Sequence, residues 1–98
     1  MRIVSWNVNG IRAVAGKGFA ESVAKMDADI IGIQEIKANI EQLSPEITDM
    51  APYKSYFYSA ERKGYSGTAL YTKKPCEVSY GLGTEEFDHE GRVIRADY

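Results

Sequence analysis

The sequence predicts an α/β fold, and three segments in its first third carry that prediction. Residues 2–8 alternate apolar and polar side chains and stop at the turn-forming pair Asn9-Gly10, as a strand does. Residues 17–27 place their apolar side chains on one helical face. Residues 29–33 form a nearly continuous apolar run, which is typical of a strand covered on both faces. Strand, helix and buried strand in this order make a βαβ unit, so we expect the two strands to be neighbours.

The middle of the chain is expected to hold short helical turns and then a hairpin. Residues 38–51 have helical spacing that Pro45 interrupts, which predicts two short helical turns. Residues 55–59 and 68–73 are rich in Tyr, Phe and Thr, and the Gly-bounded segment 64–67 lies between them. This composition predicts two antiparallel strands joined by an exposed tip.

The last third predicts two more strands, at 78–80 and 92–98, with a loop at 81–88 between them. The sequence contains no internal repeat, low-complexity tract or linker. It stops at Tyr98 inside the final strand, and its few helices would cover only one side of a sheet of roughly six strands. We therefore expect residues 1–98 to be the N-terminal portion of one larger domain, with the other face of its sheet exposed.

Composition narrows the class of protein. The 98 residues include 12 Lys and Arg against 14 Asp and Glu, for a net charge of −2, and 44% are hydrophobic. These values are typical of a globular domain, and no apolar run approaches the ~20 residues of a membrane helix. The N-terminus lacks the apolar stretch of a secretory signal, and a lone Cys76 cannot form an internal disulfide. We expect a cytoplasmic protein with no membrane partner.

Two polar side chains end the two strands of the βαβ unit. Asn7 ends the first strand, and Glu35 follows the apolar run of the second. The carboxyl ends of strands in an α/β sheet form the usual ligand crevice, and Mg²⁺ takes one or two carboxylates plus water. Asn7 could orient the carboxylate by a hydrogen bond or lend its amide oxygen to the metal. The alternative is a surface ion pair between Glu35 and Lys37 or Arg12, with Asn7 capping a turn.

Four segments resemble the successive N-terminal motifs of the exonuclease III/AP endonuclease family. They are residues 5–13 (SWNVNGIRA), 33–37 (IQEIK), 64–67 (GYSG) and 90–94 (EGRVI). The resemblance covers essentially the whole chain, but the chain covers well under half of the family's domain. It implies a two-sheet α/β sandwich (DNase I-like) with outer helices. It also implies a base-excision-repair nuclease that cleaves double-stranded DNA at abasic sites and has 3′–5′ exodeoxyribonuclease activity. The implied cofactor is Mg²⁺ (or Mn²⁺), and the complete protein is expected to be a monomer.

Position by position, the resemblance assigns roles to eight residues. Glu35 falls on the family's metal-binding glutamate, and Asn7 falls on the active-site asparagine beside the metal, so both are catalytic and metal-site candidates. Asn9 falls where members carry Asp or Asn near the metal. Positions at or next to DNA contacts are Arg12, Lys17, Tyr65, Ser66 and Arg92.

Several alternatives remain beside these roles. Tyr65 could instead pack back on Tyr58 or Tyr71, and the pair Arg62-Lys63 is interpreted as an ordinary solvated turn. His89 lies in an acidic loop that does not match the family's C-terminal Asp-His motif, so we expect a surface residue.

The family's water-activating Asp-x-Asn pair, its tyrosine and its Asp-His motif are missing from residues 1–98. We therefore expect the isolated chain not to cleave DNA, since no group would activate the nucleophile. Two other functions stay open. One is a different metal-dependent phosphoesterase of the same superfamily, and the other is a non-catalytic nucleic-acid-binding fragment.

Overall fold

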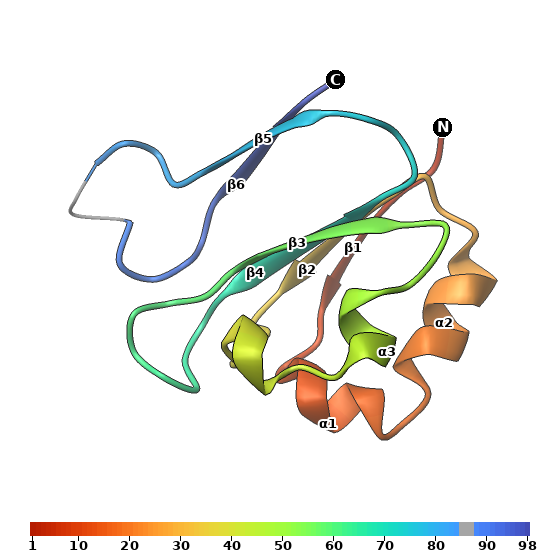
Figure 1. Ribbon diagram of the computed structural model, residues 1–98, viewed down its shortest axis with the longest axis horizontal. Coiled ribbons are helices and arrows are strands. Elements are labelled where there is room, and N and C mark those ends of the chain that lie inside the picture. The colour runs from red at the N-terminus through yellow and green to blue at the C-terminus, as the bar shows by residue number, and fades with distance from the viewer. Residues whose placement is uncertain (85–87) are drawn as a thin grey trace.

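The computed structural model describes residues 1–84 and 88–98, which form a mixed α/β structure (Figure 1). Its elements, in chain order, are β1 (Ile3–Asn7), α1 (Ile11–Ala15), α2 (Phe19–Met26), β2 (Ile30–Gln34), the 3₁₀ turn η1 (Ile40–Gln42), α3 (Pro45–Thr48), β3 (Lys54–Tyr58), β4 (Thr68–Thr72), β5 (Glu77–Tyr80) and β6 (Ile94–Asp97). Residues 85–87 of the predicted loop 81–88 lie outside the described residues.

The strands form two sheets, of four strands and of two. The larger sheet has the order β1-β2-β4-β3, and β5 pairs with β6 in a separate antiparallel ribbon. The parallel pairing of β1 with β2 and the hairpin of β3 with β4 confirm the predicted βαβ unit and hairpin. The expectation of one sheet of roughly six strands is wrong, because the last two strands pair only with each other.

The hydrophobic core lies between the larger sheet and the helices. Side chains alternate across a strand, so Ile31 and Ile33 of β2 face the same side and are fully buried there. Phe19 of α2 packs on Tyr71 of β4, with ring centroids 6.0 Å apart. The Tyr71 hydroxyl donates a hydrogen bond of 2.8 Å to the Ile47 carbonyl of α3, which satisfies both groups in the core.

The opposite face of the larger sheet is covered in part. The β5–β6 ribbon lies on the side away from the helices (Figure 1), where Tyr80 contacts Tyr58 with centroids 5.4 Å apart. The Tyr98 hydroxyl also donates a 2.9 Å hydrogen bond to Thr72 Oγ1. Ile3 of β1 remains 66% exposed. The predicted exposed face is therefore confirmed at β1, whereas β3 and β4 carry contacts from the ribbon.

The first two helices and the last strand differ most from the sequence prediction. The five-residue α1 was not expected, and α2 begins at Phe19 because residues 16–18 form a turn. The last strand begins at Ile94 instead of residue 92, so Arg92 lies in the preceding loop. The two short turns expected in 38–51 are η1 and α3.

Among the described residues, no helix has the length and apolar character that crossing a bilayer requires.

Candidate functional site

Three connections meet at one edge of the larger sheet: residues 8–11 after β1, 35–37 after β2 and 64–67 before β4. We call them the site loops. Backbone hydrogen bonds join the first two, with Gly10 N donating to Glu35 O at 2.8 Å and Ile11 N to Ile36 O at 2.9 Å. The second loop also donates to the third. Ile36 N donates to Gly67 O at 3.1 Å, and Lys37 N donates to Ser66 O at 2.8 Å. The three loops therefore form one hydrogen-bonded unit.

Four residues in the site loops adopt positive φ although none is glycine. Their φ angles are 47° at Asn9, 55° at Glu35, 52° at Lys37 and 51° at Ser66. The left-handed region costs an L-residue about 1–2 kcal/mol, and such strain persists only where the surroundings impose it. The hydrogen bonds between the loops impose it here. Clustered strain of this kind is characteristic of functional sites.

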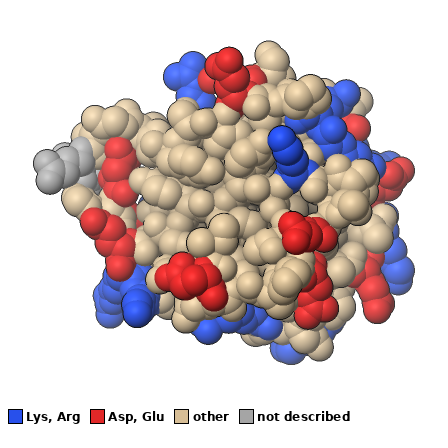
Figure 2. Space-filling model, viewed as in Figure 1, with Lys and Arg blue, Asp and Glu red and all other residues tan. Residues whose placement is uncertain are grey.

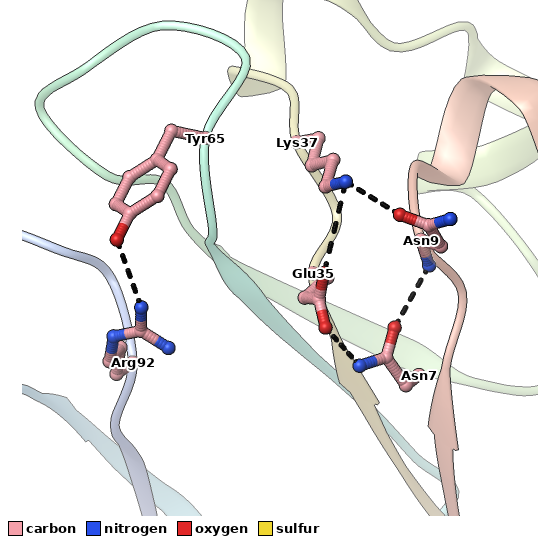
Figure 3. A network of polar contacts seen from close by, with 6 residues as sticks. All are labelled: Asn7, Asn9, Glu35, Lys37, Tyr65 and Arg92. Carbon is pink, nitrogen blue, oxygen red and sulfur yellow. Dashed lines mark hydrogen bonds and ion pairs between the residues drawn. The ribbon is translucent and has the colours of Figure 1, made fainter.

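Asn7 holds the Glu35 carboxylate in a defined orientation (Figure 3). The backbone N–H of Asn9 donates to Asn7 Oδ1 at 3.0 Å. A backbone N–H can only donate, so the amide oxygen must face it, and the Asn7 Nδ2–H group then points at Glu35 Oε2 and donates to it. Of the two roles considered for Asn7, this arrangement favours the positioning role.

Lys37 is the cation nearest to Glu35 in the site loops (Figure 3). Its Nζ lies 3.8 Å from Glu35 Oε1 and donates to Asn9 Oδ1 at 2.5 Å. The alternative of an ion pair with Lys37, together with a turn capped by Asn7, thus matches contacts that are present. The pair is long, however, and its side chains are 39% and 41% exposed. Such pairs contribute about 0–1 kcal/mol, so Glu35 stays available to another cation.

A cleft of about 270 Å³ opens beside the Glu35 carboxylate. Its lining contains four of the residues predicted from the sequence, Asn7, Glu35, Ser66 and Arg92, together with Gln34, Gly67 and Thr68. The cleft therefore brings a carboxylate and a guanidinium group together from segments more than fifty residues apart in the chain. A larger hollow of about 390 Å³ lies on the helical side between α2 and residues 49–53, away from these strand ends.

Tyr65 and Arg92, which Figure 3 shows in contact, form a second polar cluster with Glu90. Arg92 Nη2 donates to the Tyr65 hydroxyl at 3.2 Å, and that hydroxyl donates to Glu90 Oε2 at 3.3 Å. Arg92 Nε donates to Glu90 Oε1 at 2.6 Å, and this hydrogen bond lowers the pKa of Glu90 and raises the pKa of Arg92. The alternative in which Tyr65 packs on Tyr58 or Tyr71 is wrong, because the Tyr65 ring contacts Arg62 and Arg92 instead. Tyr58 packs on Tyr80, and Tyr71 is fully buried in the core.

The remaining predicted residues lie outside the cleft lining. Arg12 is exposed on α1 and reaches the Lys37 carbonyl with its Nη2 at 3.4 Å, so it borders the site loops. Lys17 is exposed in the turn between α1 and α2 and contributes nothing to the cleft. His89 contacts Glu61 through Nδ1, and its side chain is 51% exposed, which matches the expected surface position.

Sequence reasoning assigned no role to Thr68 or Glu90, and it grouped Gln34 with Glu35 at the end of the second strand without giving it a role of its own. Asn7, Gln34 and Thr68 are register partners across β1, β2 and β4, so they form one row at the sheet edge. The two-residue period of β2 could have revealed Gln34, because it faces opposite to the buried Ile33. Glu90 stands two residues before Arg92, but no local sequence signal connects either to Tyr65.

The donor atoms of the cleft fit a hard divalent cation held by a single carboxylate. Within residues 1–84 and 88–98, no group of three His, Cys, Asp or Glu side chains could enclose a metal. Mg²⁺ does not require such a cage, since it keeps several waters and binds one or two carboxylates plus substrate phosphates. Glu35 would be the protein ligand, and the open cleft leaves room for water and phosphate oxygens.

Positive and negative side chains are mixed on the face of the molecule seen in Figure 2. In the face seen in Figure 2, Lys and Arg alternate with Asp and Glu around the rim, and the centre carries few charged side chains. Any attraction of an anionic ligand must therefore come from individual groups near the cleft and not from the net charge of −2.

Comparisons with known proteins agree with this geometry. Residues 4–94 match the family described as the Endonuclease/Exonuclease/phosphatase family. Over the whole chain, the sequence is 46% identical to an exodeoxyribonuclease of Bacillus subtilis and 45% identical to the DNA repair nuclease APEX1 of Danio rerio. The chain spans 38% and 33% of the lengths of these two proteins.

Solved structures of similar proteins share the fold. An AP endonuclease from Archaeoglobus fulgidus superimposes on 98% of the chain with a TM-score of 0.82 at 29% identity, and the match covers 36% of that protein. The catalytic domain of Xenopus laevis APE2 superimposes on 96% with a TM-score of 0.78 at 36% identity, covering 38% of that chain. The resemblance to the exonuclease III/AP endonuclease family and the DNase I-like fold are confirmed, and the chain belongs to the endonuclease/exonuclease/phosphatase family.

Proposed function

We propose that this chain forms the N-terminal portion of a metal-dependent DNA-repair nuclease. The whole protein would hydrolyse the phosphodiester at abasic sites in double-stranded DNA and would also act as a 3′–5′ exodeoxyribonuclease. Relatives named exodeoxyribonuclease, DNA repair nuclease and AP endonuclease, each aligned over the full chain, support this activity. Their lengths, of which the chain spans between 27% and 38%, support its being one part of a larger domain. The proposed setting is the cytoplasm, and the proposed state of the whole protein is a monomer.

The observation that carries the proposal is the shared cleft of Glu35 and Arg92. A carboxylate alone would repel a phosphodiester, so a cation between the two is a requirement for binding. Glu35 would hold Mg²⁺, with Mn²⁺ as a substitute, and Asn7 keeps the carboxylate pointed into the cleft through its amide hydrogen bond. When bound, the metal supplies Lewis-acid stabilisation of charge on the phosphoryl and leaving oxygens.

The opposite wall would hold the DNA backbone. Arg92 lines the cleft, and phosphate oxygens accept charge-assisted hydrogen bonds from guanidinium groups. Ser66 lines the same wall, and the neighbouring Tyr65 stands at the exposed tip, where it would meet a sugar or groove edge. Arg12 and Lys17 lie beyond the cleft and would contact phosphates farther along the duplex.

Activation of the attacking water would come from other parts of the protein. Glu35 is the only carboxylate that lines the cleft among the described residues, and it is assigned to the metal. His89 is engaged by Glu61 away from this lining. A metal ligand without a general base cannot position and deprotonate a nucleophile, so these residues bind and orient the phosphodiester without cleaving it alone.

The test is incision of a labelled DNA duplex that contains one synthetic abasic site, using the protein expressed from the complete reading frame. Wild-type protein should cut the strand with Mg²⁺ and stop when EDTA is added. Glu35→Gln keeps the shape of the side chain and should abolish turnover while DNA binding persists. The matched control is Glu41→Gln, an exposed position in η1 outside the cleft, which should cut like the wild type.

Other outcomes of this test separate the alternatives. Mg²⁺-dependent hydrolysis of another phosphoester without incision of abasic DNA would favour a different phosphoesterase activity. DNA binding without cleavage under any metal would favour a binding protein. Sequencing the gene past the codon for Tyr98 tests the proposed domain boundary, since a continuing frame should carry an Asp-x-Asn pair and a terminal Asp-His.

A further inference from the structure

Tyr65 at the tip of the β3–β4 connection lies close to two arginine side chains. The guanidinium carbon of Arg62 is 5.4 Å from the centre of the Tyr65 ring, and that of Arg92 is 5.8 Å from it. Both distances fall within the range of cation–π contacts. One aromatic ring therefore organises two cations that come from different segments of the chain.

The two arginines differ in their electrostatic pairing. Arg92 donates a hydrogen bond to Glu90, and Glu90 also accepts one from the Tyr65 hydroxyl. These hydrogen bonds hold the side chains of Glu90, Arg92 and Tyr65 in place. Arg62 has no hydrogen bond or ion pair with any residue in the described part of the chain, and its contact there is the Tyr65 ring. The cluster thus carries one guanidinium whose charge the described residues do not neutralise.

The position of the cluster points to its ligand. Arg92 lines the cleft beside Glu35, and Ser66, the neighbour of Tyr65, lines it as well. Figure 3 shows Tyr65 and Arg92 on one side and the Glu35 network on the other. Arg62 does not line the cleft itself, but it contacts the ring of Tyr65, whose chain neighbour Ser66 and hydrogen-bond partner Arg92 both line it. A guanidinium held there without a carboxylate partner among the described residues suits a second phosphate.

We propose that Arg62 is a further DNA-contacting residue that grips the strand together with Arg92, with the Tyr65 ring as the spacer between them. The proposal rests on the proposed DNA-binding function. The guanidinium carbons are no farther apart than the sum of their distances to the ring centre. Because one strand carries a phosphate about every 3.4 Å of helix axis, the pair would reach phosphates within a segment of about three nucleotides.

Lys63 provides a matched control in the same loop. It neighbours Arg62, carries the same charge and is also exposed, but it makes no hydrogen bond, ion pair or ring contact with the described residues. Loss of either charge changes the net charge of the protein equally. A difference between the two variants therefore reports position and not total charge.

The experiment measures binding to an abasic duplex at several salt concentrations, using the complete protein with the Glu35→Gln substitution, which should bind DNA without cutting it. Arg62→Gln should weaken binding about tenfold, the effect of one charged hydrogen-bonding group. It should also reduce the slope of log affinity against log salt by about 0.9, the value for one phosphate contact. Lys63→Gln should change both quantities much less. Equal effects of the two variants would overturn the proposal.

Variants of Tyr65 test the spacer. Tyr65→Phe keeps the ring, so Arg62→Gln should still weaken binding in that background. Tyr65→Leu removes the ring, and there Arg62→Gln should have a clearly smaller effect, because the two changes share one interaction. An undiminished effect would refute the spacer role.

The same data separate failure of this inference from failure of the proposed function. If the wild-type protein neither binds nor cuts abasic DNA, both are overturned. If the wild type cuts DNA and Arg92→Gln weakens binding, but Arg62→Gln behaves like Lys63→Gln, only the role of Arg62 is refuted. Thermal unfolding of each variant should match that of the wild type, because these side chains lie outside the core.

Discussion

Substituting Gly67 by Ala tests whether the site loops are packed together as one unit. Gly67 has φ of +89°, and a Cβ built there would lie 2.6 Å from Cγ1 and 3.2 Å from Cδ1 of Ile36. Ile36 is fully buried and follows the candidate metal ligand Glu35. Its side chain cannot withdraw into free space, so the loop that carries Glu35 must shift.

The expected cost has two parts. Placing an L-residue in the left-handed region costs about 1–2 kcal/mol, and overpacking a filled core costs about 1–3 kcal/mol more. Gly64→Ala is the control at the other end of the same tip, because its φ is +69° and nothing lies within 4 Å of its built Cβ. Gly64→Ala should therefore pay only the cost of the left-handed conformation. The free energy of unfolding should therefore fall by about 2–5 kcal/mol for Gly67→Ala and by about 1–2 kcal/mol for Gly64→Ala.

Equilibrium urea unfolding followed by circular dichroism measures both values. Only Gly67→Ala should also weaken metal binding, since only that change displaces Ile36 and its neighbour Glu35. Equal losses of stability in the two variants would refute the reasoning, because they would show that the tip and the Glu35 loop are not in contact.

Four further predictions rest on the same structure. Tyr71→Phe leaves the Ile47 carbonyl without its donor in the core and should cost about 1–3 kcal/mol in thermal unfolding. Burial raises the pKa of Tyr71 above the ordinary tyrosine value of 10.0. The buried, protonated hydroxyl therefore contributes its full stabilisation below that pH. At higher pH the unfolded chain loses this proton first, so the free energy of unfolding should fall in an alkaline titration. Asn7→Ala should weaken metal affinity about 10- to 100-fold in calorimetry, as loss of a group that orients a ligand does. The isolated 98-residue chain should not incise abasic DNA with Mg²⁺, and chelator-sensitive cutting by it would contradict this.

The parts of the fold that repeat a simple period were predictable from sequence. The alternation before Asn9 and the apolar run ending at Ile33 predicted two strands, and the helical face between them predicted their parallel pairing. The ends of those strands predicted where Asn7 and Glu35 would meet. The five-residue α1 was missed because its length gives barely more than one turn, too short for a helical period to show.

The details of the site depended on long-range contacts that no local pattern encodes. The backbone hydrogen bonds between the site loops involve main-chain groups, which are the same for every residue type. The left-handed conformation of Glu35 and Lys37 is likewise invisible in a sequence, because these residues do not favour it. Tyr65 was expected at an exposed tip, but its partner Arg92 lies 27 residues farther along the chain, so no local pattern connects the two.

Binding of Mn²⁺ by the complete protein tests the central claim most directly. Free Mn²⁺ can be counted by electron paramagnetic resonance in the presence of wild-type protein, Glu35→Gln and the control Glu41→Gln, without any reaction taking place. If Glu35 holds the catalytic cation, the wild type and Glu41→Gln should remove the same amount of free Mn²⁺, and Glu35→Gln should lose a binding site. Equal binding by all three proteins would contradict the assignment of the metal to Glu35 and to the cleft that it shares with Arg92.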